Sequence, residues 1–294
     1  MKDAATFQVP QQIAICGAGV MGTGIATALL LHQFPVTLYD LSDAVLERAH
    51  HQIARNLEKA VQKGKLAAEL LHPVLQEKIS FTTRLEDCAA ADCVIEAIIE
   101  DRTAKIELLH RLESLLPSRA IIATNTSSIA ISSLQSELQH PGRFLGLHFF
   151  NPAHIMKLVE VVKGAFTLDV VVEVIKDFSE SIGKIPVIVK DVPGFIVNRV
   201  ARNFYNEALR IVEEGTASVE QVDRLLRSYG FRMGPFELMD LIGVDTNFAV
   251  TLSVWQQYFY DPRFAPALLQ KQLVDAKKWG QKTGEGFYRY SQQD

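Results

Sequence analysis

The sequence predicts an α/β fold, in which a mostly parallel sheet with a two-helix insertion is followed by an all-α C-terminal domain. Short β-rich apolar runs alternate with helical patterns through the first two-thirds of the chain, which is typical of a parallel sheet covered on both faces. Two helical patterns, Asp43–Gln62 and Leu66–Leu75, separate one pair of runs where a simple crossover needs one helix. After Val192-Pro193-Gly194 the pattern is wholly helical. We therefore expect one domain over residues 1–191 and a second over residues 192–294.

The expected strands are short and bounded by turn residues. They span Ile13–Cys16, Val36–Tyr39, Ile79–Thr82, Cys93–Ala97, Ala120–Thr124, Phe144–Phe149, Met156–Val162 and Ile185–Val189. A helix is expected over Gly22–Leu31, and in the second domain over Phe195–Glu214, where Gly215 follows as a C-cap. Ser218 with Gln221 predicts a capping box for the next helix, which Gly230 ends.

The composition is that of a globular protein, with 48% apolar and 22% charged residues. A net charge of −4 provides no basic field for nucleic acid or an anionic membrane, so neither is an expected partner. The three cysteines lack metal-ligand or redox-motif spacing, and we expect a cytoplasmic protein without disulfides or a metal site. Glycines interrupt the apolar segment Ile13–Phe34, and no basic n-region or cleavage site accompanies it, so we expect neither a spanning helix nor a signal peptide.

A glycine-rich turn follows the first expected strand. Gly17, Gly19 and Gly22 fit G-x-G-x-x-G between a strand and a helix, which is the context of a dinucleotide-binding Rossmann unit. Gly17 would allow the tight turn, Gly19 the approach of a pyrophosphate, and Gly22 close packing of helix on strand. The pyrophosphate would then lie at the positive end of a helix. The alternative is a glycine-rich turn without a ligand.

The end of the second strand predicts which dinucleotide binds. Asp40 lies 18 positions after Gly22, where an acid can accept a hydrogen bond from a ribose 2′-hydroxyl. Its charge would repel a 2′-phosphate, and Leu41 follows it without an adjacent arginine. The predicted cofactor is therefore NAD and not NADP.

Two polar residues interrupt apolar strand patterns. His148 lies near the end of Phe144–Phe149, and Glu160 is centred in the apolar run Met156–Val162. A lone buried carboxylate is costly unless paired, and adjacent antiparallel strands could bring the two side chains together. Glu160 would then fix the imidazole tautomer and leave the other ring nitrogen as a base. The simpler alternative is a satisfied core histidine and an edge-strand glutamate.

A polar loop follows the fifth expected strand. Asn125-Thr126-Ser127-Ser128 lies at a carboxyl end of the sheet, where open α/β sheets bind ligands. One alternative is that Ser127 or Ser128 only caps the helical pattern Ile129–Leu134. Capping and catalysis are compatible at this position.

At this point the sequence resembles a known family, the L-3-hydroxyacyl-CoA dehydrogenases of fatty-acid β-oxidation, including 3-hydroxybutyryl-CoA dehydrogenases. The resemblance covers about residues 11 to 290. The motifs that carry it stand in the family's order: Gly17–Gly22, Glu96-Ala97-Ile98-Ile99-Glu100, Asn125-Thr126-Ser127-Ser128, His148-Phe149-Phe150-Asn151-Pro152, Met156-Lys157-Leu158-Val159-Glu160, Pro193-Gly194-Phe195-Ile196-Val197-Asn198-Arg199, Met233-Gly234-Pro235 and Lys282-Thr283-Gly284-Glu285-Gly286-Phe287-Tyr288.

The resemblance implies a reaction, the reversible NAD-dependent oxidation of (3S)-3-hydroxyacyl-CoA to 3-oxoacyl-CoA. His148 would take the proton of the 3-hydroxyl, and Glu160 would orient it and stabilise its imidazolium. Ser127 and Asn198 would hydrogen-bond the reacting oxygens.

The resemblance also implies binding residues. Five residues match positions around the cofactor: Glu100, Lys105, Asn125, Asn151 and Lys282. A helical-hairpin insertion would hold the CoA end of an acyl-CoA thioester substrate, with Lys63 and Ser127 at substrate-binding positions. Asn56 stands there where some members have serine, so its contact is an open expectation. The family pattern does not match His154, which is expected to be an exposed turn residue or a neighbour of the substrate entry.

Other activities remain alternatives. The scaffold also suits a dehydrogenase of a free hydroxy acid or sugar acid, of the gulonate or carnitine type, or a non-catalytic crystallin-like protein that only holds NAD. Val250–Val254 and Arg263–Pro266 are similar to a phenylacetate-degradation branch whose substrate is a 3-hydroxyadipyl thioester. A homodimer is expected as in the family. No crotonase-like segment precedes the Rossmann unit, so we expect a single activity.

Overall fold

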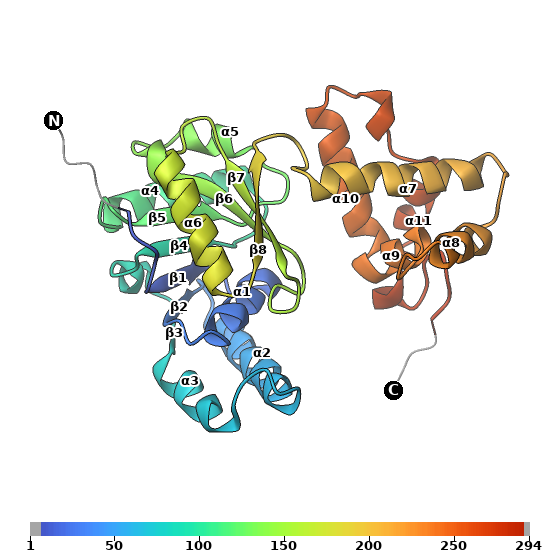
Figure 1. Ribbon diagram of the computed structural model, residues 1–294. Helices are drawn as coiled ribbons and strands as arrows, with labels where there is room; N and C mark the ends of the chain where they lie inside the picture. The colour runs from blue at the N-terminus through green and yellow to red at the C-terminus, as the bar shows by residue number, and fades with distance from the viewer. Residues whose placement is uncertain (1–6, 291–294) are drawn as a thin grey trace. The chain divides into compact units, whose positions relative to one another are not determined.

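The computed structural model describes residues 7–290 and divides the chain into two compact units. The first unit ends at Val192 and the second begins at Pro193. Figure 1 shows a sheet with helices on it in the first unit and a cluster of helices in the second.

The first unit is built on one eight-stranded sheet in the order β3-β2-β1-β4-β5-β6-β7-β8. Strands β1 to β6 run parallel, β7 is antiparallel to β6, and β8 is parallel to β7. The strands are β1 (Ile13–Cys16), β2 (Val36–Tyr39), β3 (Ile79–Thr82), β4 (Cys93–Glu96), β5 (Ile121–Thr124), β6 (Phe144–Phe149), β7 (Leu158–Lys163) and β8 (Ile185–Lys190). The predicted mostly parallel sheet is thus confirmed.

Helices α1 to α6 belong to the first unit and α7 to α11 to the second. The helices of the first unit are α1 (Val20–Leu30), α2 (Asp43–Gln62), α3 (Leu71–Glu77), α4 (Arg102–Leu115), α5 (Ile131–Gln135) and α6 (Asp169–Ser181). Those of the second unit are α7 (Val197–Glu213), α8 (Val219–Ser228), α9 (Pro235–Ile242), α10 (Val244–Gln257) and α11 (Leu268–Asp275). The predicted all-α second part is thus confirmed as well.

Several helix starts differ from the prediction; α7, for example, begins at Val197 where Phe195 was expected. The helix expected from Gly22 begins at Val20 with Gly19 as its N-cap, so the glycine turn is shorter than expected. The helix expected over Leu66–Leu75 is a 3₁₀ turn followed by α3, in which Pro73 is the third residue. Proline fits only the first turn of a helix because it lacks an N–H, which explains the later start.

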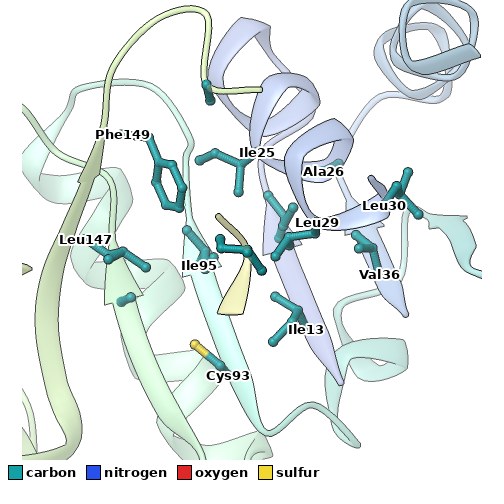
Figure 2. Packing of buried hydrophobic residues seen from close by; sticks show 14 of the residues in the cluster. Ile13, Ile25, Ala26, Leu29, Leu30, Val36, Cys93, Ile95, Leu147 and Phe149 are labelled. Atoms are coloured by element: carbon teal, nitrogen blue, oxygen red, sulfur yellow. The ribbon is translucent and has the colours of Figure 1, made fainter. Parts of the chain in front are cut away.

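The core of the first unit lies where α1 packs on the sheet. Figure 2 shows Ile25 and Leu29 of α1 directed at side chains of β1, β4 and β6, among them Ile95 and Leu147. Burying each such side chain contributes about 1.5–3 kcal/mol. This packing fixes the start of α1 against the carboxyl ends of the strands.

Helix α2 begins and ends as predicted and is amphipathic. Its buried residues recur at helical spacing: Leu46, Ala49, Ile53, Leu57 and Ala60. These residues belong to the same core as α1, so the insertion after β2 is anchored beside the glycine turn.

The three cysteines, Cys16, Cys88 and Cys93, are buried and form no disulfide. Over residues 7–290, none of the helices has both the length and the apolar character needed to span a membrane.

In the second unit, Ser218 and Gln221 form the predicted capping box at the start of α8. The buried carboxylate of Asp240 accepts hydrogen bonds from the backbone N–H groups of Phe287 and Tyr288. These bonds attach the C-terminal segment, which contains Lys282, to α9.

Candidate active site

The three glycines after β1 have different structural reasons to be glycine. Gly17 has φ of 106°, and a Cβ there would lie 2.5 Å from the carbonyl oxygen of Ala97. A Cβ at Gly22 would lie 1.8 Å from the carbonyl oxygen of Gly17, so α1 approaches the turn too closely for a side chain. A Cβ at Gly19 would have no neighbour within 4 Å. Packing therefore requires Gly17 and Gly22, whereas Gly19 leaves open space beside the start of α1.

Asp40 is bonded to this turn. Its carboxylate accepts hydrogen bonds from the backbone N–H of Ala18, at 2.8 Å, and from that of Ser42, at 3.1 Å. The residue therefore holds the glycine turn against the end of β2. It also lines a cavity of about 610 Å³ beside that turn.

The walls of this cavity suit a flat, largely apolar group. Val20, Leu41 and Ile99 are large hydrophobic residues that stay exposed and line it. Exposed apolar surface in a concave site is typical of a ligand pocket. With a positive helix end and an acid nearby, the cavity fits the adenosine side of a dinucleotide. Arg111 of α4 also lines it. No sequence pattern indicated this, because Arg111 lies far along the chain from the glycine turn.

A buried ion pair lies at the end of β4. The Lys105 ammonium is 2.6 Å from Glu96 Oε1, and the two side chains are only 1% and 0% exposed. Glu96 also accepts hydrogen bonds from the backbone N–H of Ile98 and from the hydroxyl of Thr124. The pair therefore joins β4, α4 and β5. Glu96 is a carboxylate within the apolar run Cys93–Ala97, the same kind of signal that Glu160 gives in Met156–Val162, and it could have marked Glu96 as a buried, paired residue.

Glu100 organises the polar loop after β5. Its carboxylate accepts hydrogen bonds from the Thr126 hydroxyl and from the backbone N–H groups of Ser127 and Ser128. Burial alone would raise the pKa of Glu100, but Lys105 at 3.3 Å and these hydrogen bonds lower it below its usual value. The carboxylate is therefore charged at neutral pH and holds the loop that carries Ser127.

His148 and Glu160 are direct neighbours across the antiparallel pair β6 and β7. Nδ1 of His148 is 2.8 Å from Oε2 of Glu160, and both side chains are buried. The ring of Phe150 packs edge-on against the imidazole with centroids 4.6 Å apart. The strand pairing that the sequence analysis considered for these two residues is present.

Asn125 links the polar loop to the histidine strand. Its Oδ1 accepts a hydrogen bond of 2.8 Å from the backbone N–H of Phe149, the residue after His148. The ends of β1, β4, β5 and β6 lie at one edge of the sheet because these strands are parallel. Gly17, Glu100, Ser127 and His148 are therefore gathered along that edge.

A second cavity of about 650 Å³ lies between α1, α2 and the turn after β6. Its lining includes Asn56, Asn151 and His154, together with Arg48 and Arg55 of α2. His154 is partly buried and not fully exposed; burial first, and then the Lys184 ammonium, lowers its pKa. Lys63 is the exposed C-cap of α2 and is not among the residues that line this cavity.

Two predicted site residues belong to the second unit. Asn198 lies in the first turn of α7, and its carbonyl oxygen accepts a hydrogen bond from Arg202. The Lys282 ammonium is 2.6 Å from the Asp245 carboxylate and packs near the Trp279 ring.

Lys184 and Arg202 are among the buried cations that the sequence analysis missed. Lys184 donates a hydrogen bond of 2.5 Å to the Ala153 carbonyl and another to Met156, so it holds the turn that lines the second cavity. Arg202 is buried in α7. Neither interrupts an apolar run, so the sequence offered no signal for them.

Two family models match the chain. The model described as "3-hydroxyacyl-CoA dehydrogenase, NAD binding domain" matches residues 12–192, and "3-hydroxyacyl-CoA dehydrogenase, C-terminal domain" matches residues 194–290. The two matches together cover nearly all of the described residues.

Curated relatives agree with these models. The chain is 46% identical over 279 residues to the 3-hydroxyadipyl-CoA dehydrogenase of Escherichia coli K12, covering 95% of this chain and 58% of the relative. It is 38% identical over 286 residues to the mitochondrial hydroxyacyl-coenzyme A dehydrogenase of Sus scrofa, covering 95% and 91%. The chain thus spans a little over half of the E. coli relative and nearly all of the pig protein.

A solved structure shares the whole architecture. The (S)-3-hydroxybutyryl-CoA dehydrogenase of Ralstonia eutropha superposes with a TM-score of 0.92 at 37% identity, covering 96% of this chain and all of the other.

Proposed function

The chain belongs to the 3-hydroxyacyl-CoA dehydrogenase family, and from this we propose that it oxidises (3S)-3-hydroxyacyl-CoA reversibly to 3-oxoacyl-CoA. Its first unit is the NAD-binding domain of that family. The observation that carries the proposal is the buried contact of 2.8 Å between His148 and Glu160, at the sheet edge where the cofactor turn also lies.

In this proposal His148 is the general base. Glu160 accepts the hydrogen bond of Nδ1–H, so Nε2 carries the lone pair. Nε2 then accepts the proton of the substrate's 3-hydroxyl and returns it in the reverse direction. NAD, when bound, supplies the hydride acceptor for C3. The carboxylate of Glu160 stabilises the imidazolium that forms, since an opposite charge in a buried site favours the protonated ring.

Ser127 and Asn198 are proposed to hydrogen-bond the reacting oxygens. Support for Ser127 comes from its loop, which four hydrogen bonds to Glu100 hold beside the strand end. Pre-positioned donors stabilise developing charge on oxygen without reorganisation during the reaction. Asn198 is supported by its place in the family motif that opens α7.

The cofactor contacts follow from the first cavity and from the family resemblance. Gly17, Gly19, Gly22 and Asp40 form the glycine turn and its anchor. Further contacts are proposed for Glu100, Lys105, Asn125, Asn151 and Lys282. Lys105 is almost wholly buried against two carboxylates. This favours an indirect role, in which Lys105 positions the carboxylate of Glu100.

The CoA portion is proposed to bind along α2. The second cavity supports this, because cationic and amide side chains of α2 line it opposite Asn151. Lys63 at the end of α2 is exposed and can meet a phosphate. Asn56 lines the cavity and also donates to Thr27 of α1 at 3.4 Å, so it joins the two helices.

Reduction of acetoacetyl-CoA by NADH tests the proposal. We expect the absorbance of NADH at 340 nm to fall, and free acetoacetate to be reduced far more slowly. A protein that binds NADH but turns over no thioester would overturn the proposal.

Replacing the base provides the residue-level test. His148→Gln should lower kcat by about 10²–10⁴-fold, the usual contribution of a general base, while NADH binding survives. Loss of NADH affinity in that variant would contradict the role. Arg224→Met, an exposed change on α8, is the control for handling and expression.

We also propose a homodimer in a reducing compartment such as the cytoplasm. The three cysteines are free thiols, as expected where disulfides are not maintained. Large apolar side chains are exposed on the second unit, among them Leu225, Tyr229, Phe231 and Phe259, and such surfaces commonly become interfaces. Analytical ultracentrifugation at micromolar concentration measures this directly; a single monomeric species would contradict it.

A further inference from the structure

Arg202 is a buried cation in the middle of α7. Its side chain is 3% exposed. Nε donates to the carbonyl oxygen of Asn198, at 3.3 Å, and Nη1 donates to the carbonyl oxygen of Asn247 and the hydroxyl of Thr251. The guanidinium also lies over the ring of Tyr205, 4.9 Å from its centroid.

Every group that holds Arg202 is neutral. In residues 7–290 no carboxylate lies within ion-pair distance of its guanidinium. Burial lowers the pKa of Arg202 to about 10, and no carboxylate opposes this; the Tyr205 phenol alone acts in the other direction. A buried charge without a counter-charge is costly, so the second unit contains a positive site that no carboxylate of the described residues neutralises.

Buried amides without partners surround this cation. Asn206 lies one turn further along α7 and is 1% exposed, and neither atom of its amide has a hydrogen-bond partner within residues 7–290. The same holds for Nδ2 of Asn247, whose Oδ1 accepts from Arg202 and from Gln270. The amide nitrogens of Asn206 and Asn247 and the guanidinium are donors suited to an anion, and the amide oxygens of Asn206 and Gln270 are unpartnered acceptors in the same region.

The cluster lies close to the proposed substrate contact. Asn198 and Arg202 are one turn apart on the same face of α7, about 6 Å along the helix axis, and the two residues are hydrogen-bonded to each other. In a six-carbon dicarboxylyl thioester, the distal carboxyl carbon lies three bonds beyond C3. A chain whose C3 oxygen meets Asn198 therefore brings its far end toward the next turn of α7.

We propose that Arg202, with Asn206 and Asn247, binds the distal carboxylate of a dicarboxylyl-CoA substrate and selects it over the corresponding monocarboxylic acyl chain. The inference rests on the proposed 3-hydroxyacyl-CoA dehydrogenase activity and deepens it. A carboxylate supplies the missing counter-charge and accepts from the unpartnered amide N–H groups. The E. coli relative named a 3-hydroxyadipyl-CoA dehydrogenase fits the same substrate class.

The test compares two thioesters of equal chain length, the 3-oxo forms of adipyl-CoA and hexanoyl-CoA, as substrates for reduction by NADH. The native enzyme should prefer the dicarboxylyl thioester by about 100-fold in kcat/KM, the worth of a few charge-assisted hydrogen bonds. Equal kcat/KM for the two thioesters would overturn the inference and leave the proposed dehydrogenase activity intact. Turnover of neither thioester would instead overturn the proposed activity.

Substitution of Arg202 tests whether this residue causes the preference for the dicarboxylyl thioester. Arg202→Met should lower kcat/KM for the dicarboxylyl thioester about 100-fold, mainly through KM, and change that for the hexanoyl thioester less than about 3-fold. Arg202→Lys keeps the charge without the planar fork and should lie between the two. The exposed Arg224→Met is the matched control. Equal losses on both thioesters in Arg202→Met would show a structural role and refute the assignment; if that variant does not fold, the native comparison and Arg202→Lys decide.

Discussion

Lys184 shows how one buried side chain makes stability depend on pH. Its ammonium is held by two backbone carbonyls, and burial lowers its pKa from 10.5 to about 8. Among residues 7–290 no carboxylate forms an ion pair with it. Its neighbours are His32 and His154, whose pKa values are lowered first by burial and then by the Lys184 charge. The charged form of Lys184 therefore lowers the stability of the folded protein, and it does so at the turn before β7.

The direction with pH follows from proton binding. Between about pH 8 and 10.5 the unfolded lysine holds more protons than the folded one, so stability from this group rises with pH across that window. The neutral amine keeps two N–H groups for its two carbonyls. We therefore expect the unfolding free energy of the native protein, minus that of Lys184→Met, to rise by about 1–3 kcal/mol from pH 8 to 10.

Urea unfolding at several pH values measures this difference, and other titrating groups cancel because both proteins share them. A difference that stays constant or shrinks would contradict the lowered pKa.

At the residue scale, a polar side chain that interrupts an apolar run was the sequence signal for a buried polar residue. His148 and Glu160 stood out for that reason, and their contact is present in the structure. Lys184 and Arg202 lie in a turn and in an amphipathic helix, where a cation is expected to face solvent. Their burial depends on segments far away in the chain, the turn after β6 and helix α10, which no local pattern shows.

At the element scale, the Glu96–Lys105 pair joins two strands to one helix. Lys105→Met removes the cation but leaves the Glu96 carboxylate buried. We expect a loss of about 3–5 kcal/mol in unfolding free energy, the usual cost of an unpaired buried charge. Adding Glu96→Gln removes that charge and should recover at least half of the loss.

A double-mutant cycle by urea unfolding tests this expectation. If the loss of unfolding free energy in the double variant equals the sum of the losses in the two single variants, Glu96 and Lys105 do not stabilise each other.

The glycine turn offers a matched pair of variants. Gly19→Ala places a methyl in open space, so stability should change by less than about 1 kcal/mol while NADH affinity falls at least about tenfold, because the methyl lies where a pyrophosphate approaches. Gly22→Ala forces a methyl against the Gly17 carbonyl and should destabilise the fold by about 1–3 kcal/mol or more.

Isothermal titration with NADH and thermal unfolding separate the two effects. Unchanged NADH affinity in Gly19→Ala would contradict a pyrophosphate at that position.

Helix α2 and four short strands, β1, β2, β3 and β6, have the predicted bounds, whereas other elements differ by one or more residues. Helix α2 has the predicted bounds because its buried residues recur regularly over twenty residues. Strand β7 begins at Leu158 and not at Met156, because the preceding residues belong to a turn whose bonds come from Lys184. The start of β7 is thus set by tertiary contacts that no local pattern shows.

At the scale of the whole molecule, the division of labour between the two units can be tested. We propose that residues 1–191 and 192–294 are separate domains, and every proposed cofactor contact except Lys282 lies in the first. Lys282 is already paired with Asp245. A fragment of residues 1–192 should therefore bind NADH within about tenfold of the full chain, the worth of one hydrogen bond or ion pair, and should reduce no acetoacetyl-CoA because Asn198 is missing.

Fluorescence titration of NADH with the fragment gives the affinity. A loss much greater than tenfold would show that the second unit contributes more to the cofactor site than Lys282 alone. The predicted division into an α/β part and a helical part followed from the change of pattern after Val192; the assembly of the two parts did not follow from any local pattern.

The pairing of His148 with Glu160 has a consequence for how such enzymes diverge. The two side chains meet through the register of β6 and β7, and a slip by one residue would turn one of them to the opposite face of the sheet. The connecting residues 150–157 are outside that register, and several of them line the second cavity. Changes of length between Ala153 and Lys157 can therefore reshape that cavity without altering the register that holds His148 against Glu160.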